Sequence, residues 1–345
     1  MSIDFENPAE LGFRMPAEWE PQEAVWLSWP LNPGTWPDRI SAVEREYAFF
    51  AAQISRFEKV RLNCVAAEQE RVRAILSEAG IVEGNLEIFD LPTNDAWCRD
   101  HGPVFVKNDQ TGEVAITDWK YNAWGGKFPP WDLDDAVPAK IADALNMRRF
   151  AIPIFGEGGG LEVNGEGLLL TTESVFLNPN RNPGYSKPEI ESVLRAALGV
   201  SEICWLKSGM EGDDTDGHID TLTRFFKPDA VLTMMEPDVN NPNHAPLQRN
   251  YDDLKAYGLE VVPLPSPKPI RPEGWREEVL PASYANYLII NGAVLVPTYR
   301  QPQTDDEALK IIADCHPDRE IIPVDCYDIL LEGGALHCLS QQQPK

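Results

Sequence analysis

The sequence has few cysteines, and they lie far apart. There are six in 345 residues, at positions Cys64, Cys98, Cys204, Cys315, Cys326 and Cys338. None belongs to a CxxC pair, and the closely spaced Cys and His pairs of a structural zinc site are missing, so we expect no metal. Scattered cysteines in a long chain predict reduced thiols and a cytoplasmic location.

The sequence also lacks a long apolar run and an excess of basic residues. The first residues, MSIDFENPAELGF, show no basic region followed by an apolar core, so we expect no signal peptide. The best apolar segment, YLIINGAVLVP, is interrupted by Asn291 and Gly292 and predicts a hairpin rather than a membrane span. A net charge of −25 argues against nucleic acid or an anionic membrane as partner. It favours a cationic ligand, with solubility alone as the other explanation.

What the sequence does contain is a repeated unit. The segments EGGGLE, from Glu157, and EGGALH, from Glu332, share the pattern E-G-G-x-L. Each follows a predicted hairpin, helix and strand. Before Glu332 these are YLIINGAVLVPTY, a helix opening TDDE with a capping box of Thr304 and Glu307, and EIIPVD; before Glu157 they are PVFVKNDQTGEVAITDW, DDAVPAKIADALNM and FAIPIF.

The same order of elements leads to His218 and to Tyr284. The helix before His218, SKPEIESVLRAALG, has its own capping box of Ser186 and Glu189 and a glycine stop at Gly199. The final polar motifs recur at intervals of roughly sixty residues. This periodicity predicts five modules of strand–strand–helix–strand, one of them enlarged by an extra strand and helix near residues 59–80.

The two chain ends should complete the last module. Only a short segment follows Cys338, and the N-terminal strand AVWLSWP can pair with it. Pairing of these ends closes a ring and removes exposed sheet edges. We therefore expect one α/β domain over residues 1–345, against the alternative of a linear α/β domain with accidental spacings.

In a ring, the module-ending motifs converge on one axis and assemble a reactive set. The motifs are NDAWCRD (94–100), EGGG (157–160), DDTDGHID (213–220) and EGGALHCLSQQQP (332–344). A nucleophilic cysteine needs a proton shuttle and a group that orients the shuttle, and Cys338, His218 and Glu157 can fill these roles. Asp100 and Asp220 would repel a developing oxyanion. They suit a guanidinium, whose paired N–H donors match carboxylates.

Other residues near these motifs have a structural explanation. Cys64 and Cys204 lie in apolar strands, and Cys98 within WCRD is expected to pack. His101 and His337 are expected to be structural or surface residues. The tryptophans Trp29, Trp97 and Trp124 are assigned to the core, with a cation–π wall for a cationic ligand as the alternative.

The ordered set of motifs resembles the agmatine deiminase family, which the porphyromonad-type peptidylarginine deiminases share. The resemblance covers residues 13–344 and is carried by FRMPAEWEP, WLSWP, NDAWCRDHGP, YNAWGGK, LLTTES…LNPNRNPG, DDTDGHIDTLTRF, PASYANY and GGALHCLSQQQP. It implies the pentein fold, a five-module α/β propeller with pseudo-fivefold symmetry, in agreement with the repeat.

The resemblance also implies roles for individual residues. These are Cys338 as nucleophile, His218 and Asp220 as the His-x-Asp pair, Glu157 as partner of the histidine, Asp100 as the second guanidinium-binding aspartate and Asp214 at the substrate's tail. In the cation–π alternative, Trp97 is a further substrate contact. It implies hydrolysis of agmatine to N-carbamoylputrescine and ammonia through an amidino-cysteine, without a metal or organic cofactor. The charges of the bound substrate and of His218 should lower the thiol pKa from about 8.5.

Several alternatives stay open at this point. The family often has Gly-Asn-Ile before His-Cys, where this chain has Gly334, Ala335 and Leu336. This difference leaves the choice of substrate open. The substrate could be arginine or peptidyl arginine, with Arg99 or Lys127 receiving a carboxylate. The group could be transferred to an amine by an amidinotransferase, or the protein could be an inactive guanidine-binding pentein. A homodimer is a further expectation.

Overall fold

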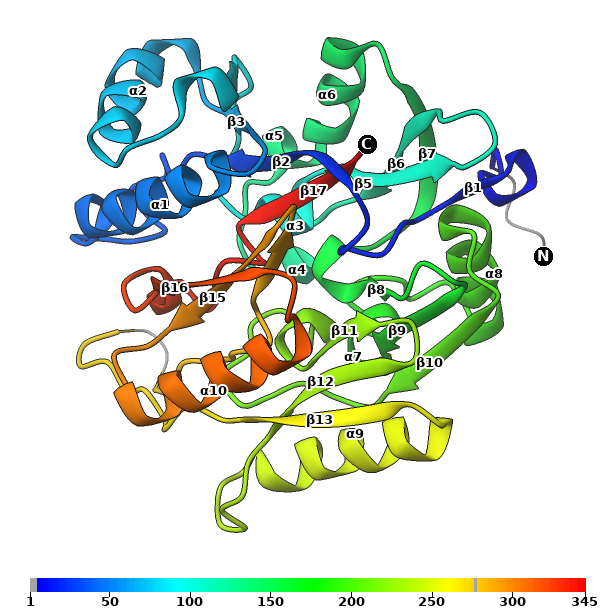
Figure 1. The fold of residues 1–345 in the computed structure, drawn as a ribbon. Coiled ribbons are helices and arrows are strands. Elements are labelled where there is room, and N and C mark those ends of the chain that lie inside the picture. The colour runs from blue at the N-terminus through cyan, green and yellow to red at the C-terminus, as the bar shows by residue number, and fades with distance from the viewer. Residues whose placement is uncertain (1–4, 276–277) are drawn as a thin grey trace.

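In a computed structural model of the chain, the described residues, 5–275 and 278–345, form five small β-sheets. Their strand orders are β1-β5-β6-β7, β8-β9-β10, β11-β12-β13, β14-β15-β16 and β17-β2-β3-β4. In each sheet two antiparallel strands are followed by a parallel one, because a helix connects the second strand to the third. Figure 1 shows the five modules following one another around a common centre, so the predicted five-module ring is confirmed.

The strands match the hairpins and crossovers expected from the repeat. Their bounds are β1 Phe13–Arg14, β2 Gln22–Ser28, β3 Lys59–Asn63, β4 Leu86–Phe89, β5 Val104–Asn108, β6 Val114–Lys120, β7 Arg148–Phe155, β8 Glu162–Val163, β9 Leu168–Thr172, β10 Glu202–Leu206, β11 Thr223–Lys227, β12 Ala230–Met235, β13 Glu260–Pro265, β14 Leu288–Ile290, β15 Ala293–Thr298, β16 Glu320–Asp325 and β17 Ser340–Pro344. Asn291 and Gly292 form the turn between β14 and β15, as predicted.

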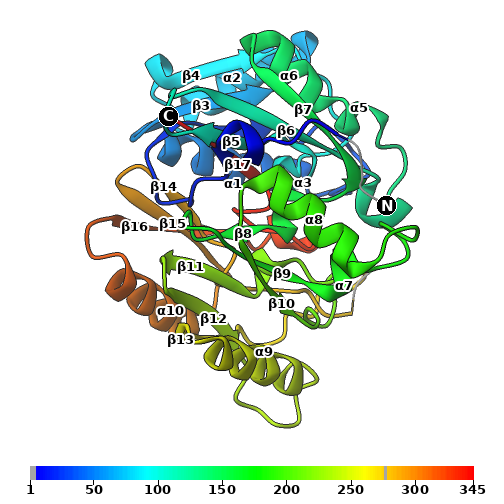
Figure 2. The same ribbon diagram turned by 90° about the vertical axis from the view of Figure 1, so that its right-hand side faces the viewer.

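The longer helices cover the outside of the ring, as the turned view in Figure 2 shows for α6, α8 and α9. The α-helices are α1 Ile40–Ser55, α2 Gln69–Glu78, α3 Cys98–His101, α4 Ala123–Gly126, α5 Asp132–Asp135, α6 Val137–Leu145, α7 Glu173–Phe176, α8 Lys187–Leu198, α9 His244–Tyr257 and α10 Pro302–Cys315. The 3₁₀ turns are η1 Ala9–Leu11, η2 Ala66–Glu68, η3 Glu83–Asn85, η4 Gly158–Gly160, η5 Ile219–Thr221 and η6 Ile329–Glu332. The strand β3 and the helix α2 are the extra elements expected near residues 59–80.

Helix α8 forms where its sequence signals predict it. The capping box of Ser186 and Glu189 is present, and Gly199 ends the helix in the left-handed conformation with a φ of 67°. Its buried face consists of Ile190, Val193, Leu194, Ala197 and Leu198, at the spacing of one helical stripe.

The start of α10 was predicted wrongly. The helix begins at Pro302, two residues before the proposed capping box, and neither Thr304 nor Glu307 caps it. Proline is preorganised for the first helical turn. Asp305 supplies the acceptor instead, taking hydrogen bonds from the backbone N–H groups of Gln301, at 2.8 Å, and Tyr299, at 3.1 Å.

The chain ends close the ring as expected. Strand β17 pairs antiparallel with β2, with Ser340 opposite Leu27. The contact continues through side chains, since Trp26 Nε1 and the Arg61 guanidinium both donate to Gln343 Oε1, at 2.9 and 2.6 Å. The N-terminal expectation of no leader peptide concerns in part residues 1–4, which lie outside the described residues.

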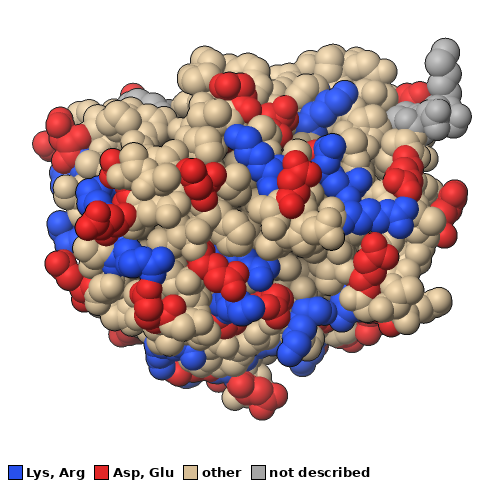
Figure 3. All heavy atoms as spheres, turned by 90° about the horizontal axis from the view of Figure 1, so that it is seen from above, with Lys and Arg blue, Asp and Glu red and all other residues tan. Residues whose placement is uncertain are grey.

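The negative net charge is not gathered in one patch on the face shown in Figure 3. There, acidic and basic side chains are interspersed. No described helix combines the length and apolar character needed to cross a bilayer. The six cysteines form no disulfide.

Candidate active site

Short turns at the ends of the modules bring the polar motifs to the centre of the ring. Asp100 lies in α3, Glu157 precedes η4, His218 precedes η5 and Asp220 lies within it, and Cys338 precedes β17. All five are buried. The structure therefore brings together the five residues predicted to form the reactive set.

His218 lies between two carboxylates. Its Nδ1 is 3.5 Å from Asp100 Oδ1, and its Nε2 is 3.8 Å from Glu157 Oε2. Burial by itself would lower the pKa of this imidazole. The attraction of Asp100, and then of Glu157, outweighs burial and raises the pKa to about 9. His218 is therefore protonated at neutral pH and can act as an acid.

Glu157 is anchored on its far side by an arginine that sequence reasoning did not single out. Arg181 Nε donates to Glu157 Oε1 at 2.6 Å, and another nitrogen of the same guanidinium donates to Asp216 at 2.9 Å. Burial would raise the pKa of Glu157, but Arg181 and His218 hold it below its ordinary value. The signal for Arg181 was its place in the motif LNPNRNPG.

Asp100 receives two hydrogen bonds that fix its carboxylate. Trp124 Nε1 donates to Oδ2 at 2.9 Å, and the backbone N–H of Gly159 donates to Oδ1 at 3.1 Å. Burial raises the pKa of Asp100 to about 6, against the opposing effect of His218. Asp100 is thus ionised at neutral pH and loses its charge under mildly acidic conditions.

Gly159 has to be a glycine because three reactive side chains approach its backbone. A Cβ atom built there would lie 2.5 Å from His218 Nδ1, 2.8 Å from Asp100 Oδ1 and 3.1 Å from Asp220 Oδ2. The structure shows a close approach to the residues of the site itself.

Asp220 is held from behind by His337. His337 Nδ1 lies 2.7 Å from Asp220 Oδ2, and His337 Nε2 lies 2.7 Å from Glu18 Oε2. Burial would raise the pKa of Asp220, but His337 and then His218 lower it. Of the two expectations for His337, a surface position is wrong and a structural role fits: the residue is buried between Asp220 and Glu18.

Two buried arginines, Arg224 and Arg99, compensate the negative charge of the buried glutamates next to His337. Arg224 contacts Glu18 at 2.8 Å and Glu162 at 2.9 Å, and Arg99 lies 3.6 Å from Glu18. Burial would raise the pKa of Glu18, but Arg224 and then His337 hold it well below its usual range. Glu18, from the motif FRMPAEWEP, is thus an ionised carboxylate that contacts both Arg224 and His337.

Two carboxylate oxygens of the site receive no hydrogen bond from a described residue, although His218 Nε2 lies 3.8 Å from one of them, Glu157 Oε2. Asp220 Oδ1 and Glu157 Oε2 are buried without a hydrogen bond from any described residue. Buried polar atoms are nearly always paired, because leaving one unpaired costs about 1–3 kcal/mol. These acceptors therefore fit a ligand that brings several N–H donors.

Cys338 is buried next to an amide and two acids. Its Sγ receives a hydrogen bond from Asn286 Nδ2 at 3.2 Å and lies 3.8 Å from Asp220 Oδ2. Burial, and then Asp220 and Asp100, raise the pKa of the thiol well above its ordinary value. The expectation of a lowered thiol pKa is wrong for the free protein, because burial, together with Asp220 and Asp100, dominates. The effect of a bound cation stays a prediction.

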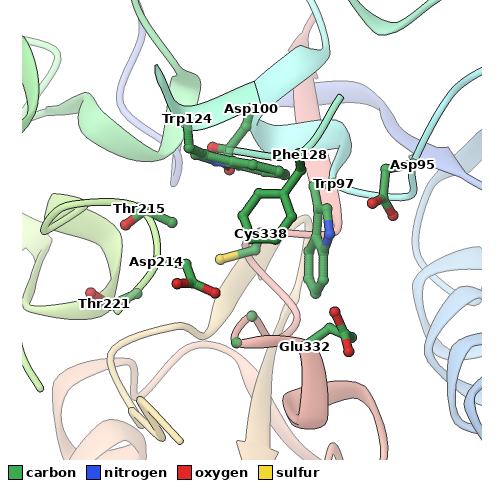
Figure 4. A pocket seen from close by; sticks show the side chains of 12 residues that line it. Asp95, Trp97, Asp100, Trp124, Phe128, Asp214, Thr215, Thr221, Glu332 and Cys338 are labelled. Atoms are coloured by element: carbon green, nitrogen blue, oxygen red, sulfur yellow. Dashed lines mark hydrogen bonds between the residues drawn. The ribbon is translucent and has the colours of Figure 1, made fainter. Parts of the chain in front are cut away.

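Cys338 opens into a pocket of about 500 Å³, counted with its mouth. Figure 4 shows the thiol pointing into it between Trp124, Phe128 and Asp214. The lining consists of Asp95, Trp97, Asp100, Trp124, Phe128, Asp214, Thr215, Thr221, Glu332, Gly333, Gly334 and Cys338. It contains four carboxylates, and none of these described lining residues is basic.

The other residues considered from the sequence have separate places. Trp97 and Asp214, the two expected substrate contacts, line the pocket, and so does Trp124. Trp29 is a core residue that donates to Glu44. Tyr284, used to mark the fourth module, donates to Asp305 instead. The residue of its motif PASYANY that reaches the site is Asn286.

In the described part of the chain, no cluster of three or more His, Cys, Asp or Glu side chains could hold a metal.

Comparison with known proteins shows which family the chain resembles. Over residues 14–344 the sequence matches the Porphyromonas-type peptidyl-arginine deiminases. Agmatine deiminase of Pseudomonas aeruginosa (strain LESB58) is 38% identical, over 100% of this chain and 99% of that protein. The structure of agmatine deiminase of Enterococcus faecalis has a TM-score of 0.92 and 34% identity, covering 100% and 99% of the two chains. A cysteine-to-serine variant of C. jejuni agmatine deiminase with substrate bound has a TM-score of 0.88 and 33% identity, covering 96% of each.

Proposed function

The chain belongs to the Porphyromonas-type peptidyl-arginine deiminase family, and we propose that it hydrolyses the guanidinium group of agmatine to give N-carbamoylputrescine and ammonia. The observation that carries the choice of substrate is the wall of the pocket. Beyond Asp100, the wall adds Asp95, Asp214 and Glu332 and contains no basic residue among those described. Agmatine has a guanidinium at one end and an ammonium at the other, so both ends find carboxylates.

The two basic residues considered as receptors for a substrate carboxylate are engaged elsewhere. Arg99 is 1% exposed and donates to Gln342 and to the His337 carbonyl. Lys127 donates to Asp216 and to the backbone carbonyl of Asp214. Arginine as a substrate would bring a carboxylate toward acids without a matching cation, which disfavours it.

The proposed binding step uses the acids that face Cys338. Asp100 and Asp220 receive the N–H groups of the guanidinium, and Asp220 Oδ1 and Glu157 Oε2, which accept no hydrogen bond from a described residue, are suitable acceptors. The aromatic rings of Trp97, Trp124 and Phe128 line the same space and can contact a flat cation. The cationic substrate offsets the acids that raise the thiol pKa, so the thiol releases its proton to solvent when substrate is bound.

The chemistry then proceeds in two halves. The Cys338 thiolate attacks the guanidinium carbon, a C–S bond forms, and one C=N electron pair moves to nitrogen. His218 gives its proton to the leaving nitrogen, and ammonia departs as the C–N bond breaks. In the amidino-cysteine that remains, water attacks the same carbon and gives one proton back to His218. The C–S bond breaks, sulfur takes the remaining hydroxyl proton, and the ureido product is released.

We expect wild-type protein to release ammonia from agmatine with a kcat/KM at least about tenfold above that for arginine. A difference of only about 1.4 kcal/mol in transition-state binding gives this ratio. An arginyl peptide should react no better than arginine. The measurement is ammonia release from the three compounds at one ionic strength.

Equal use of arginine and agmatine would contradict the agmatine assignment while leaving guanidine hydrolysis intact. The matched variant is Asp214→Asn, which removes a charge from the wall. It should reduce kcat/KM for agmatine more than for arginine, so that the ratio between the two substrates falls.

A pair of isosteric variants at His337 tests how Asp220 is held. The amide nitrogen of asparagine can take the place of Nδ1, and that of glutamine the place of Nε2. His337→Asn therefore keeps a donor toward Asp220, whereas His337→Gln keeps one toward Glu18. We expect His337→Gln to have the lower kcat/KM for agmatine, by about tenfold, since a hydrogen bond to a charged group contributes about 1.5–3 kcal/mol. Equal losses in both variants would contradict this role.

Three further features are part of the proposal. We propose that residues 1–345 act as one catalytic domain, since the reactive set draws on several modules and β2 pairs with β17. The unpaired cysteines support work in the cytoplasm. A homodimer stays a prediction, which light scattering of the purified protein checks.

A further inference from the structure

A second cavity adjoins the pocket that holds Cys338. It measures about 910 Å³, counted with its mouth. Four residues line both cavities and are drawn around the Cys338 pocket in Figure 4: Asp95, Trp124, Phe128 and Glu332. The two cavities therefore share a wall of single side chains, and a ligand of sufficient length can occupy both.

The charge of the second cavity is negative. Its lining adds Asp134 to the shared Asp95 and Glu332, and it contains one basic residue, Lys127. That ammonium is already paired with Asp216, at 2.8 Å. The other lining residues are neutral. The cavity therefore favours a cationic group over an anionic one.

Asp134 is held rigidly, with one carboxylate oxygen to spare. The residue is 2% exposed, and its Oδ1 accepts from the backbone N–H groups of Asn94, at 2.7 Å, and Asp95, at 3.4 Å. In return, Asn94 Oδ1 accepts from the backbone N–H groups of Leu133 and Asp134. Both hydrogen bonds to the carboxylate use Oδ1, so Oδ2 remains for a ligand.

Tyr121 brings a buried hydroxyl to the same cavity. The residue is 4% exposed and lines the cavity, and its hydroxyl makes no hydrogen bond with any described residue. Burial, and then Asp134, raise the pKa of this phenol well above its ordinary value, so it stays neutral. A buried polar atom without a partner is unfavourable, and a ligand with N–H donors relieves this.

We propose that the second cavity binds an ammonium group, and that the protein accepts guanidines whose tails are longer than that of agmatine and carry a second amine. The proposal rests on the proposed function, which places the guanidinium at Cys338 and the first amine beside the acids of that pocket. The terminal ammonium, with its three N–H donors, donates to Asp134 Oδ2 and to the Tyr121 hydroxyl. The aliphatic chain between the amines lies against the shared Trp124 and Phe128.

A matched pair of compounds tests the site. In one, an aminopropyl group is attached to the amine of agmatine; in the other, an n-butyl group of the same length takes its place. Both keep the guanidinium and a charged secondary amine, so they differ only in the terminal group. We expect the aminopropyl compound to have a wild-type kcat/KM at least about tenfold above that of the butyl compound. Equal values overturn the proposal.

The assay is run at about pH 8 because burial raises the pKa of Asp134 to about 7. At that pH this carboxylate is ionised, and the primary amine of the tail is still protonated.

Three variants locate the effect. Asp134→Asn keeps an acceptor for the two backbone N–H groups and removes the charge, and Tyr121→Phe removes only the unpaired hydroxyl. Each should reduce the ratio between the two compounds by about threefold or more, while kcat/KM for agmatine stays within about twofold of wild type. The control is Asp132→Asn, since Asp132 is exposed and does not line the cavity; its ratio should equal that of wild type.

An unchanged ratio in a folded Asp134→Asn variant overturns the proposal. Should that variant fail to melt cooperatively, Tyr121→Phe decides in the same way. This second variant should melt no lower than wild type, because the hydroxyl that it removes has no partner to lose.

Binding without turnover separates this proposal from the proposed function. In Cys338→Ala protein, calorimetric titration should give a Kd for the aminopropyl compound at least about tenfold below that for the butyl compound. If wild-type protein releases ammonia from no guanidine, the proposed function fails. The calorimetric comparison then still decides the second cavity, and equal Kd values overturn its role.

Discussion

Replacing Cys338 with alanine is expected to abolish ammonia release from agmatine while the fold survives. In the proposed mechanism its thiolate makes and breaks the bond to the guanidinium carbon, and no other described cysteine lines the pocket. The lost side chain is small and buried, so its removal leaves only a small cavity and a modest loss of stability. The measurement is kcat for agmatine alongside a thermal melt.

The matched control for this prediction is Cys98→Ala. Cys98 is also fully buried, and burial raises the pKa of its thiol to about 12. It does not line the pocket, so the variant should retain most of the wild-type activity. Turnover by Cys338→Ala near the wild-type rate would rule out the covalent mechanism.

Replacing Asp220 or Asp100 with asparagine is expected to reduce kcat/KM for agmatine by about thirtyfold or more. Each substitution removes one of the two charges proposed to bind the guanidinium, and losing one partner of a buried charge pair costs about 2–5 kcal/mol. The misplaced carbon adds to the loss, because attack requires near-contact geometry. Both variants keep the volume of the site, so they can be compared directly by steady-state kinetics and melting.

The pH dependence distinguishes the two aspartates. Burial raises the pKa of Asp100 to about 6, while His337 and His218 lower that of Asp220. As pH falls through about 6, Asp100 gains a proton and loses its charge, so wild-type kcat/KM should fall on that side. In Asp100→Asn, kcat/KM should not fall as the pH drops through about 6. A fall is expected only at the lower pH at which Asp220 gains a proton. An unchanged acid limb in Asp100→Asn would contradict the assignment of the limb to Asp100.

Much of the fold follows from local sequence patterns. The capping box of Ser186 and Glu189, the turn at Asn291 and Gly292, and the recurring order of elements each depend on residues close together in the chain. Where two local signals competed, at the start of α10, the sequence favoured Thr304, but Pro302 and Asp305 define the helix. Asp305 also accepts a hydrogen bond from the backbone N–H of Tyr299, a residue that precedes the helix.

By itself, the sequence determined the five modules, the closing of the ring and the residues that meet at its centre, including Cys338 and His218. Periodicity and motif spacing can be read along the chain without knowledge of contacts, and closure follows once each module must complete its sheet. Tertiary structure alone decided the partners: His337 behind Asp220, Asn286 on the thiol, and Arg99 turned away from the pocket. These contacts join residues from different modules, and burial makes their charges interact strongly. Neither their distances nor their pKa shifts can be read from residues adjacent in the chain.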